Sequence, residues 1–143
     1  MITVGIVEDN AFATAMLQRL IDATDDLACG FACGSVEDAL ENLRENVPDV
    51  LLVDVHLPGM SGVDVAGRVV ELYPDVRLLM LTADDDSSTI VAALEAGACG
   101  YLLKNSSGDE IIGGIREAFN GGVPLTKEVA RKMVDAFREK IIR

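Results

Sequence analysis

Five short runs of apolar, largely β-branched residues alternate along this chain with segments of helical periodicity. The runs cover residues 2–7, 27–33, 50–53, 77–81 and 99–103. Continuous apolar runs of this length are typical of strands that are buried on both faces, as in a parallel sheet covered by helices. The alternation therefore predicts an α/β fold: a doubly wound, five-stranded parallel sheet with right-handed crossovers and helices on both faces.

Capping residues and helix breakers mark the segments between the strands as helices. Asn10, Ser35 and Ser61 can each cap a helix that begins after it, and Gly97 can end a later one. The first helix is expected to pack through residues at helical spacing, namely Phe12, Ala13, Met16, Leu17 and Leu20. For a small doubly wound sheet the expected strand order is 2-1-3-4-5, the flavodoxin-like order.

Charge is unevenly distributed along the chain. Acidic residues outnumber basic ones by 24 to 12, so the formal net charge is -12. This excess of acid argues against a broad surface for nucleic-acid phosphate. Residues 124–143 nevertheless hold six basic and three acidic residues, and the change falls near Gly121-Gly122-Val123-Pro124. We therefore expect one domain over residues 1–122 and a linker with an extra helix over residues 123–143.

The segment after this boundary carries an apolar stripe at helical spacing. We expect a helix over residues 126–142 with Thr126 as its N-cap. The stripe consists of Val129, Met133, Phe137 and Ile141, with Ala130 and Val134 beside it. Because an exposed stripe of this kind would be a liability, we expect it to be an association surface, in a homodimer. Packing of the helix on its own domain and a partly helical, flexible linker remain open alternatives.

The sequence predicts neither a membrane protein nor a secreted one. Its apolar runs are far too short to span a bilayer, and the N-terminus has no basic stretch before an apolar one. The three cysteines, Cys29, Cys33 and Cys99, are odd in number and include no Cys-x-x-Cys pair. We therefore expect a cytoplasmic location, no membrane contact, and free, buried thiols.

Polar side chains directly follow four of the five predicted strands. Glu8 and Asp9 follow the first strand, and Asp54, Thr82 and Lys104 follow the third, fourth and fifth. Since the carboxyl ends of these strands lie side by side in this topology, we expect the five side chains to share one cleft. Clustered acids need a cation among them, and an all-oxygen ligand set suits Mg²⁺. Asp54 could then accept a phosphoryl group, with Lys104 and Thr82 contacting the phosphoryl oxygens.

These motifs resemble the receiver domain of two-component response regulators, over residues 2 to about 122. The resemblance is carried by Glu8-Asp9, by the stretch Asp54-Val-His-Leu-Pro-Gly-Met-Ser-Gly, by Thr82-Ala83 and by Ala96-Gly-Ala-Cys-Gly-Tyr-Leu-Leu-Lys104. The last stretch, with Gly121-Gly122, is similar to the NarL/FixJ (LuxR-type) subfamily of transcription regulators. The resemblance implies a phosphoprotein whose partner is a sensor histidine kinase. It implies no enzymatic activity beyond the protein's own phosphorylation and dephosphorylation.

The resemblance also implies roles for individual residues. Asp54 would be the phosphoacceptor, Lys104 would contact the phosphoryl group, and Thr82 and Tyr101 would form a switch pair. The protein ligands of Mg²⁺ would be the carboxylates of Glu8, Asp9 and Asp54 and the backbone carbonyl of His56.

Two further expectations concern the rim of the site. His56 and Asp84, two residues beyond the phosphoacceptor and the switch hydroxyl, would flank the path of the attacking water and tune the lifetime of the phosphoryl group. The Lys104–Asn105 peptide bond would be cis, as is usual in related receivers, although the proline that often follows the lysine is replaced here by Asn105.

Alternative functions remain open at this point. Members of the subfamily continue into a helix-turn-helix domain, so this chain would bind DNA only through a C-terminal domain that it lacks. A stand-alone receiver that acts through protein contacts is the alternative. A haloacid-dehalogenase-like phosphatase would carry a second acid where this chain has His56, and a flavodoxin-like flavin binder would need a phosphate-binding loop where it has Glu8-Asp9-Asn10.

Overall fold

The computed structural model describes the backbone of residues 1–142 and the side chains of residues 1–140. Its elements, in chain order, are β1 (Ile2–Val7), α1 (Ala11–Asp22), β2 (Leu27–Cys33), α2 (Val36–Glu45), β3 (Val50–Val53), α3 (Gly62–Leu72), β4 (Arg77–Thr82), α4 (Ser87–Ala96), β5 (Gly100–Leu103), α5 (Gly108–Phe119) and α6 (Lys127–Ile142). The strand and helix alternation predicted from the sequence is therefore present.

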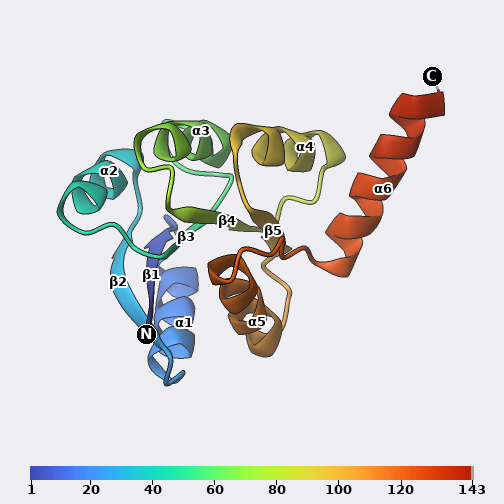
Figure 1. Cartoon of the computed structure of the whole chain (residues 1–143). Helices are drawn as coiled ribbons and strands as arrows, with labels where there is room; N and C mark the ends of the chain where they lie inside the picture. Colours follow the sequence, from blue (N-terminus) through green and yellow to red (C-terminus); the bar gives the residue numbers. More distant parts are fainter. Residues whose placement is uncertain (143) are drawn as a thin grey trace.

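The five strands form one parallel sheet in the order β2-β1-β3-β4-β5. Helices α1 and α5 cover one face of the sheet, and α2, α3 and α4 cover the other, as Figure 1 shows. The doubly wound architecture and the predicted strand order are both confirmed. Helix α6 lies beside β5 and α4 and then extends away from the domain (Figure 1).

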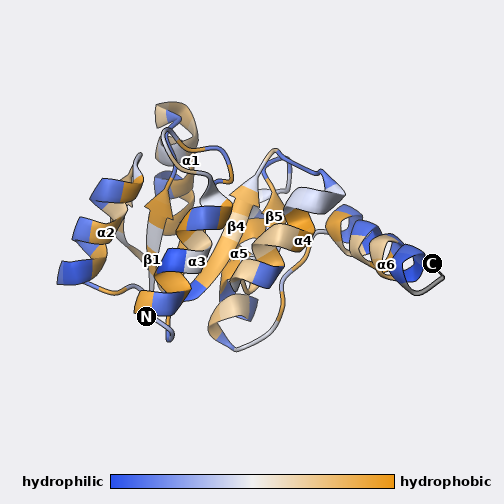
Figure 2. Ribbon diagram, turned by 90° about the horizontal axis from the view of Figure 1, so that it is seen from above, coloured by the Kyte–Doolittle hydropathy of each residue, from blue (hydrophilic) through white to orange (hydrophobic). Residues whose placement is uncertain are grey.

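The core consists of two apolar layers, one on each side of the sheet. Alternate residues of a strand enter opposite layers: Leu51 and Val53 pack with α2, α3 and α4, whereas Val50 and Leu52 pack with α1 and α5. All four of these β3 side chains are buried, which is why the strand reads as a continuous apolar run. The apolar colouring of the central strands in Figure 2 reflects this double burial.

Local hydrogen bonds fix the starts of the helices. The predicted N-caps Asn10, Ser35 and Ser61 accept bonds from the backbone N–H groups of Ala13, Asp38 and Asp64. Helix α1 begins three residues beyond β1, and α3 begins after a loop of residues 54–61 beyond β3, so both connections lie at the carboxyl edge of the sheet. The polar residues at those ends are thereby held at one edge of the sheet.

The first helix packs only partly as predicted, because Leu17 and Leu20 contact the core but Phe12 and Met16 do not. Leu17 and Ile21 are its buried residues, while Phe12 is 75% exposed and Met16 is 53% exposed. One series of apolar residues at i, i+4 spacing begins at Phe12, and a second series begins one position later. The buried residues Leu17 and Ile21 belong to the second series. Phe12 and Met16 instead lie beside a surface groove between α1 and α5.

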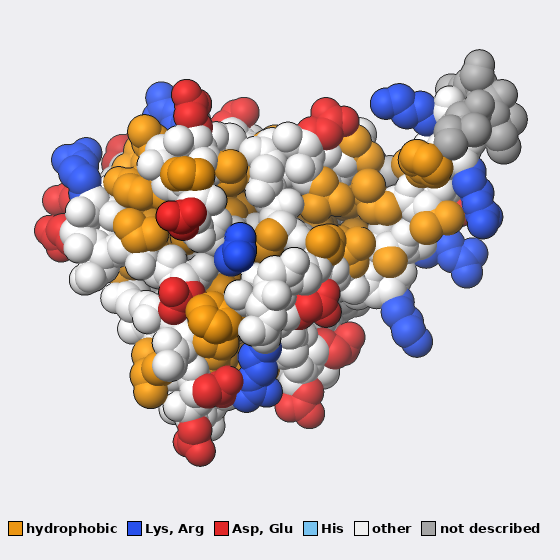
Figure 3. Space-filling view, in the orientation of Figure 1, with side chains coloured by type: hydrophobic (Ala, Val, Ile, Leu, Met, Phe, Trp, Pro, Cys, Tyr) orange, Lys and Arg blue, Asp and Glu red, His pale blue; other side chains and the backbone are white. Residues whose placement is uncertain are grey.

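The first turns of α6 belong to the core of the domain, which partly contradicts the expectation of a separate helix. Val129 is completely buried, and Met133 packs against the same apolar layer. Beyond this point the helix leaves the domain, and Val134 and Phe137 are 46% and 64% exposed. The side chain of Ile141, the last residue of the predicted stripe, lies outside the described residues. Figure 3 shows hydrophobic side chains where α6 leaves the domain and basic side chains along its outer part.

Thr126 stands directly before α6, the predicted N-cap position, and its carbonyl accepts a bond from the Ala130 N–H, but its hydroxyl does not serve the helix. Its hydroxyl accepts a hydrogen bond from the Leu103 N–H at 3.1 Å, which joins the helix start to the end of β5. On the same segment, the Tyr101 N–H donates to the Pro124 carbonyl and the Thr126 N–H donates to the Tyr101 carbonyl. The chain before α6 therefore runs along β5.

The three cysteines are free, as predicted, but each is partly exposed rather than fully buried. Burial raises the pKa of the Cys33 and Cys99 thiols to about 11, so both are protonated at neutral pH. Within residues 1–142, no helix is long and apolar enough to cross a membrane.

Candidate functional site

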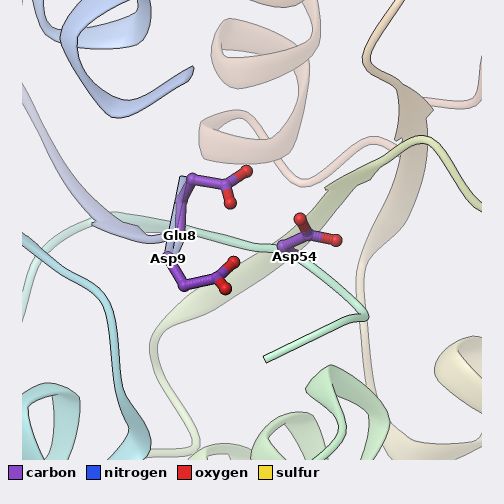
Figure 4. Close-up of side chains that lie close together, drawn as sticks. All are labelled: Glu8, Asp9 and Asp54. Carbon is purple, nitrogen blue, oxygen red and sulfur yellow. The ribbon is translucent and has the colours of Figure 1, made fainter. Parts of the chain in front are cut away.

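Three carboxylates meet at the carboxyl edge of the sheet. Glu8 and Asp9 follow β1 directly, and Asp54 follows β3; Figure 4 shows the three side chains beside one another. Each has a carboxylate oxygen within 4.8 Å of the others. Glu8 and Asp54 are buried, whereas Asp9 is exposed, so the cluster opens to solvent on the Asp9 side.

Lys104 supplies the positive charge within this cluster. Its ammonium lies 2.7 Å from the Asp54 carboxylate and also pairs with Glu8. The Lys104 N–H donates to the Thr82 carbonyl at 2.9 Å, which holds the residue in register with the end of β4. The strand-end residues predicted to share one cleft therefore lie together, and the ion pairs of Lys104 with Asp54 and Glu8 are an addition from the structure.

The two buried carboxylates have pKa values shifted in opposite directions. Burial alone would raise the pKa of Asp54, but hydrogen bonds from Lys104, Thr82 and the His56 N–H outweigh it and lower the pKa. For Glu8, burial is the largest influence and raises the pKa, and repulsion from Asp54 adds to the effect of burial. Of these two carboxylates, Asp54 therefore stays ionised more readily, as a nucleophile must.

The Lys104 ammonium is kept charged by the same pairs. Burial would lower its pKa, but its hydrogen bonds to Asp54 and Glu8 outweigh this and raise it. A permanent cation beside Asp54 can stabilise negative charge arriving on a phosphoryl oxygen.

Thr82 and Tyr101 lie on neighbouring strands next to this cluster. Both side chains are completely buried, and the Thr82 oxygen accepts a hydrogen bond from the Asp84 N–H at 3.3 Å. The Tyr101 hydroxyl donates to the Asp84 carbonyl at 2.6 Å. Both members of the predicted switch pair therefore contact the loop that follows β4, and Tyr101 already lies inside the domain.

His56 and Asp84 meet across the rim of the site. The His56 Nε2 lies 2.8 Å from an Asp84 carboxylate oxygen, and the His56 N–H donates to Asp54 at 3.1 Å. The sequence placed both residues near Asp54, but their mutual contact could not be predicted because the two loops are 28 residues apart. The contact joins the β3–α3 loop to the β4–α4 loop.

The expected cis bond after Lys104 is absent, because every peptide bond of residues 1–142 is trans. A cis bond before a residue other than proline costs about 2.5–4 kcal/mol. Lys104 reaches both Asp54 and Glu8 with a trans bond before Asn105, so the site does not need the cis form to aim the ammonium.

The donor set fits a magnesium ion by its chemistry. Mg²⁺ prefers oxygen ligands and keeps several waters, and the exposed Asp9 leaves room for waters beside the buried pair. Net negative charge also favours a divalent cation, since three carboxylates face a single ammonium.

Comparison with known proteins decides the family. The model of the response regulator receiver domain matches residues 4–116. The chain belongs to this family. Receiver domains bind Mg²⁺ at an acidic pocket, and the acidic cluster of this receiver is a group of that kind. The family predicted from the strand-end motifs is therefore confirmed.

Individual relatives place the receiver among transcription regulators. It is 33% identical to the transcriptional regulatory protein LnrK of Bacillus subtilis (strain 168), over 100% of this chain and 66% of LnrK. The receiver of a NarL response regulator from Mycobacterium tuberculosis is 28% identical, with a TM-score of 0.80, and the match covers 84% of this chain and 97% of that one. A LuxR-family regulator from Aurantimonas sp. SI85-9A1 shares the fold at 24% identity, with a TM-score of 0.89, over 95% of this chain and 97% of that one.

These relatives bear on two predictions. NarL and LuxR regulators are the subfamily expected from the sequence, and that expectation is confirmed. The chain spans about two thirds of the length of LnrK. The relatives are regulators rather than classical enzymes.

Proposed function

We propose that this receiver accepts a phosphoryl group from a sensor histidine kinase on Asp54 and thereby controls an output. The observation that carries the proposal is the state of Asp54, which is buried, has a lowered pKa and is paired with Lys104 beside two further carboxylates. A carboxylate in this setting is an ionised nucleophile next to a cation that can receive phosphoryl charge. The cytoplasmic location expected from the sequence is part of the same proposal.

The transfer exchanges one bond to phosphorus for another. An Asp54 oxygen attacks the phosphorus, the bond between phosphorus and the kinase histidine nitrogen breaks, and the imidazole takes up a proton. Lys104 would hold a phosphoryl oxygen, and Thr82 would donate a hydrogen bond to another. Glu8, Asp9, Asp54 and the His56 carbonyl would hold Mg²⁺, which neutralises phosphoryl charge when bound.

Phosphorylation would then act through Thr82 and Tyr101. Their contacts with Asp84 link the site to the surface formed by α4 and β5. A hydrogen bond that Thr82 makes only in the phosphorylated state would shift the equilibrium between two conformations of that surface. His56 and Asp84, which meet over the rim, would tune the hydrolysis of the acyl phosphate.

The proposed output is transcription regulation by a DNA-binding domain beyond this chain. Support comes from the name of LnrK and from the part of its length that the chain does not span. In this proposal residues 1–122 are the receiver and residues 123–143 lead to the output domain, with a homodimer as the active form. A stand-alone receiver that acts through protein contacts is the alternative.

Intact mass spectrometry tests the phosphoryl-acceptor assignment. Incubation with acetyl phosphate and Mg²⁺ should add one phosphoryl group, with acetate as the leaving group. Addition of a chelator should prevent the mass gain, because the acidic cluster repels the donor unless a cation screens it. A mass gain that is equally fast without divalent metal would contradict the proposed role of the carboxylates.

The groove between α1 and α5 is the proposed docking surface for the kinase. It has a volume of ≈ 620 Å³ and an apolar lining that includes Phe12, Met16, Leu20 and Ile111. Lys104, which pairs with Asp54, also lines it, so a helix seated there carries its histidine close to the phosphoacceptor. Exposed aromatic and thioether side chains around a groove are suited to an amphipathic helix.

Phe12→Ala should slow phosphotransfer from the cognate kinase about tenfold, because Phe12 is the large exposed aromatic of this groove. Transfer can be measured with a panel of phosphorylated sensor kinases from the source organism. Phosphorylation by acetyl phosphate should stay unchanged, since this small donor needs no docking surface. Phe119→Ala is the matched control, because Phe119 is an exposed phenylalanine at the far end of α5. Equal slowing by both variants would contradict docking at this groove.

A further inference from the structure

The loop between β4 and α4, residues 83–86, is held from two sides by residues near the phosphoacceptor. The His56 ring contacts the Asp84 carboxylate at 2.8 Å, and the buried Tyr101 hydroxyl donates to the Asp84 carbonyl at 2.6 Å. The Asp84 N–H in turn donates to the Thr82 oxygen. Because that oxygen accepts from the loop, its own hydrogen points away from the Asp84 N–H, and a hydrogen bond from Thr82 is one of the influences that lower the pKa of Asp54. The position of the loop therefore sets the direction of the Thr82 donor.

Helix α6 holds the same loop from a third side. The Lys132 ammonium donates to the Asp85 carbonyl at 2.8 Å and lies 3.1 Å from the Asp85 carboxylate. Glu128, one turn earlier on α6, lies 3.8 Å from the same ammonium. Lys132 thus bonds to the backbone as well as to a side chain of the loop, although the two residues are 47 positions apart.

The start of α6 also holds Tyr101 through its backbone. The peptide groups of Tyr101 bond to Pro124 and Thr126, and the Thr126 hydroxyl accepts from the Leu103 N–H. Val129, one turn into the helix, is completely buried in the apolar layer that contains Tyr101. The segment before α6 therefore fixes the Tyr101 backbone, while Lys132 fixes the loop whose Asp84 carbonyl accepts the hydrogen bond from the Tyr101 hydroxyl.

We propose that Lys132 is a positioning residue for the Asp54 site: by holding the 83–86 loop, it stabilises the arrangement in which Tyr101 is inside and Thr82 faces Asp54. This inference rests on the proposed function, because a phosphoryl group on Asp54 favours the same direction of the Thr82 donor. Phosphorylation and α6 docking are then positively coupled. Such coupling is reciprocal. If phosphorylation strengthens the contact of α6 with the loop by some factor, loss of the Lys132 contact weakens phosphoryl binding by the same factor.

The experiment uses the full chain and beryllofluoride with Mg²⁺ as the phosphoryl mimic. Lys132→Met should raise the dissociation constant of the mimic about fivefold, whereas Lys132→Arg should restore it because the cation is kept. Lys140→Met is the matched control, since Lys140 is an exposed lysine about 12 Å farther along α6. Asp85→Asn removes the ion pair from the loop side and should change the constant in the same direction as Lys132→Met.

A second measurement reports the loop without any ligand. The chain has only two tyrosines, Tyr73 and Tyr101, so 3-fluorotyrosine labelling gives two ¹⁹F resonances that Tyr73→Phe assigns. The Tyr101 resonance should move in Lys132→Met and stay in place in Lys132→Arg and Lys140→Met, while the Tyr73 resonance stays in place in all three. A merely structural contribution of Lys132 to stability would leave the Tyr101 resonance of the folded protein unchanged.

The outcomes separate this inference from the proposed function. If the wild type binds the mimic and Lys132→Met binds it equally well or more tightly, the positioning role is wrong. If the wild type binds no mimic, or if binding survives Asp54→Asn, the proposed function fails. In that case the Tyr101 resonance of Lys132→Met still decides whether α6 holds the loop.

Discussion

Asp54→Asn should abolish phosphorylation completely, both from acetyl phosphate and from a kinase. The amide has nearly the shape of the carboxylate but lacks the charge and the nucleophilic oxygen that attack on phosphorus requires. The alternative carboxylates of the cluster cannot take over: Glu8 is paired with Lys104 and has a raised pKa, and Asp9 lies on the solvent side. Intact mass after incubation with acetyl phosphate and Mg²⁺ measures the effect.

Asp64→Asn is the control for this experiment. Asp64 is an exposed carboxylate in the first turn of α3, so the substitution changes the net charge equally without touching the cluster. We expect wild-type phosphorylation in this variant. If Asp54→Asn still gains a phosphoryl group, another residue is the acceptor, and that result would falsify the assignment.

Gly62→Ala should have the largest effect on stability, with a loss of about 3 kcal/mol or more in the free energy of unfolding. A Cβ at this position would lie 2.1 Å from the Asp54 carbonyl oxygen and 2.7 Å from the Val55 Cα. Both are backbone atoms, so the clash cannot be relieved by a change of side-chain rotamer. The Gly62 N–H also donates to the Val55 carbonyl at 2.6 Å, so the close approach is fixed by a hydrogen bond. Urea unfolding followed by circular dichroism measures the change.

Gly67→Ala is the matched substitution in the same helix. A Cβ at Gly67 meets nothing within 4 Å, and alanine is preferred to glycine inside a helix by about 0.5–1 kcal/mol. This variant should therefore be slightly more stable than the wild type. If Gly62→Ala is as stable as Gly67→Ala, the tight packing of the β3–α3 turn described here is wrong.

The strand-end residues could be predicted because each lies beside a strong local signal. Asp54 follows four apolar, partly β-branched residues that are typical of a buried strand and stand before a Pro-Gly turn, and Lys104 follows a similar apolar run. Once the strands are known, the topology alone brings Glu8, Asp54 and Lys104 to one edge of the sheet. Physical chemistry then supplies the pairing, because a buried carboxylate needs a cation or a hydrogen-bond donor.

The details that the sequence could not reveal depend on the relative rotation and position of elements. Phe12 and Leu17 belong to two stripes of α1 that differ by one residue, and only packing against α5 decides which of them is buried. The contact of Lys132 with Asp85 likewise depends on where α6 lies relative to α4, over a separation of 47 residues. A local pattern of apolar residues predicts that α6 packs, but not where its packing ends.

The pairing of residues 124–126 with β5 has a consequence for the solubility of the receiver. β5 is the last strand of the sheet, and unpaired peptide groups on such a strand invite strand addition by another chain. The bridge between Tyr101 and Leu125, with the bonds from Pro124 and Thr126, covers part of that border. A receiver shortened at residue 122 would expose it, so any aggregation of such a fragment would report an uncovered strand rather than the native mode of assembly.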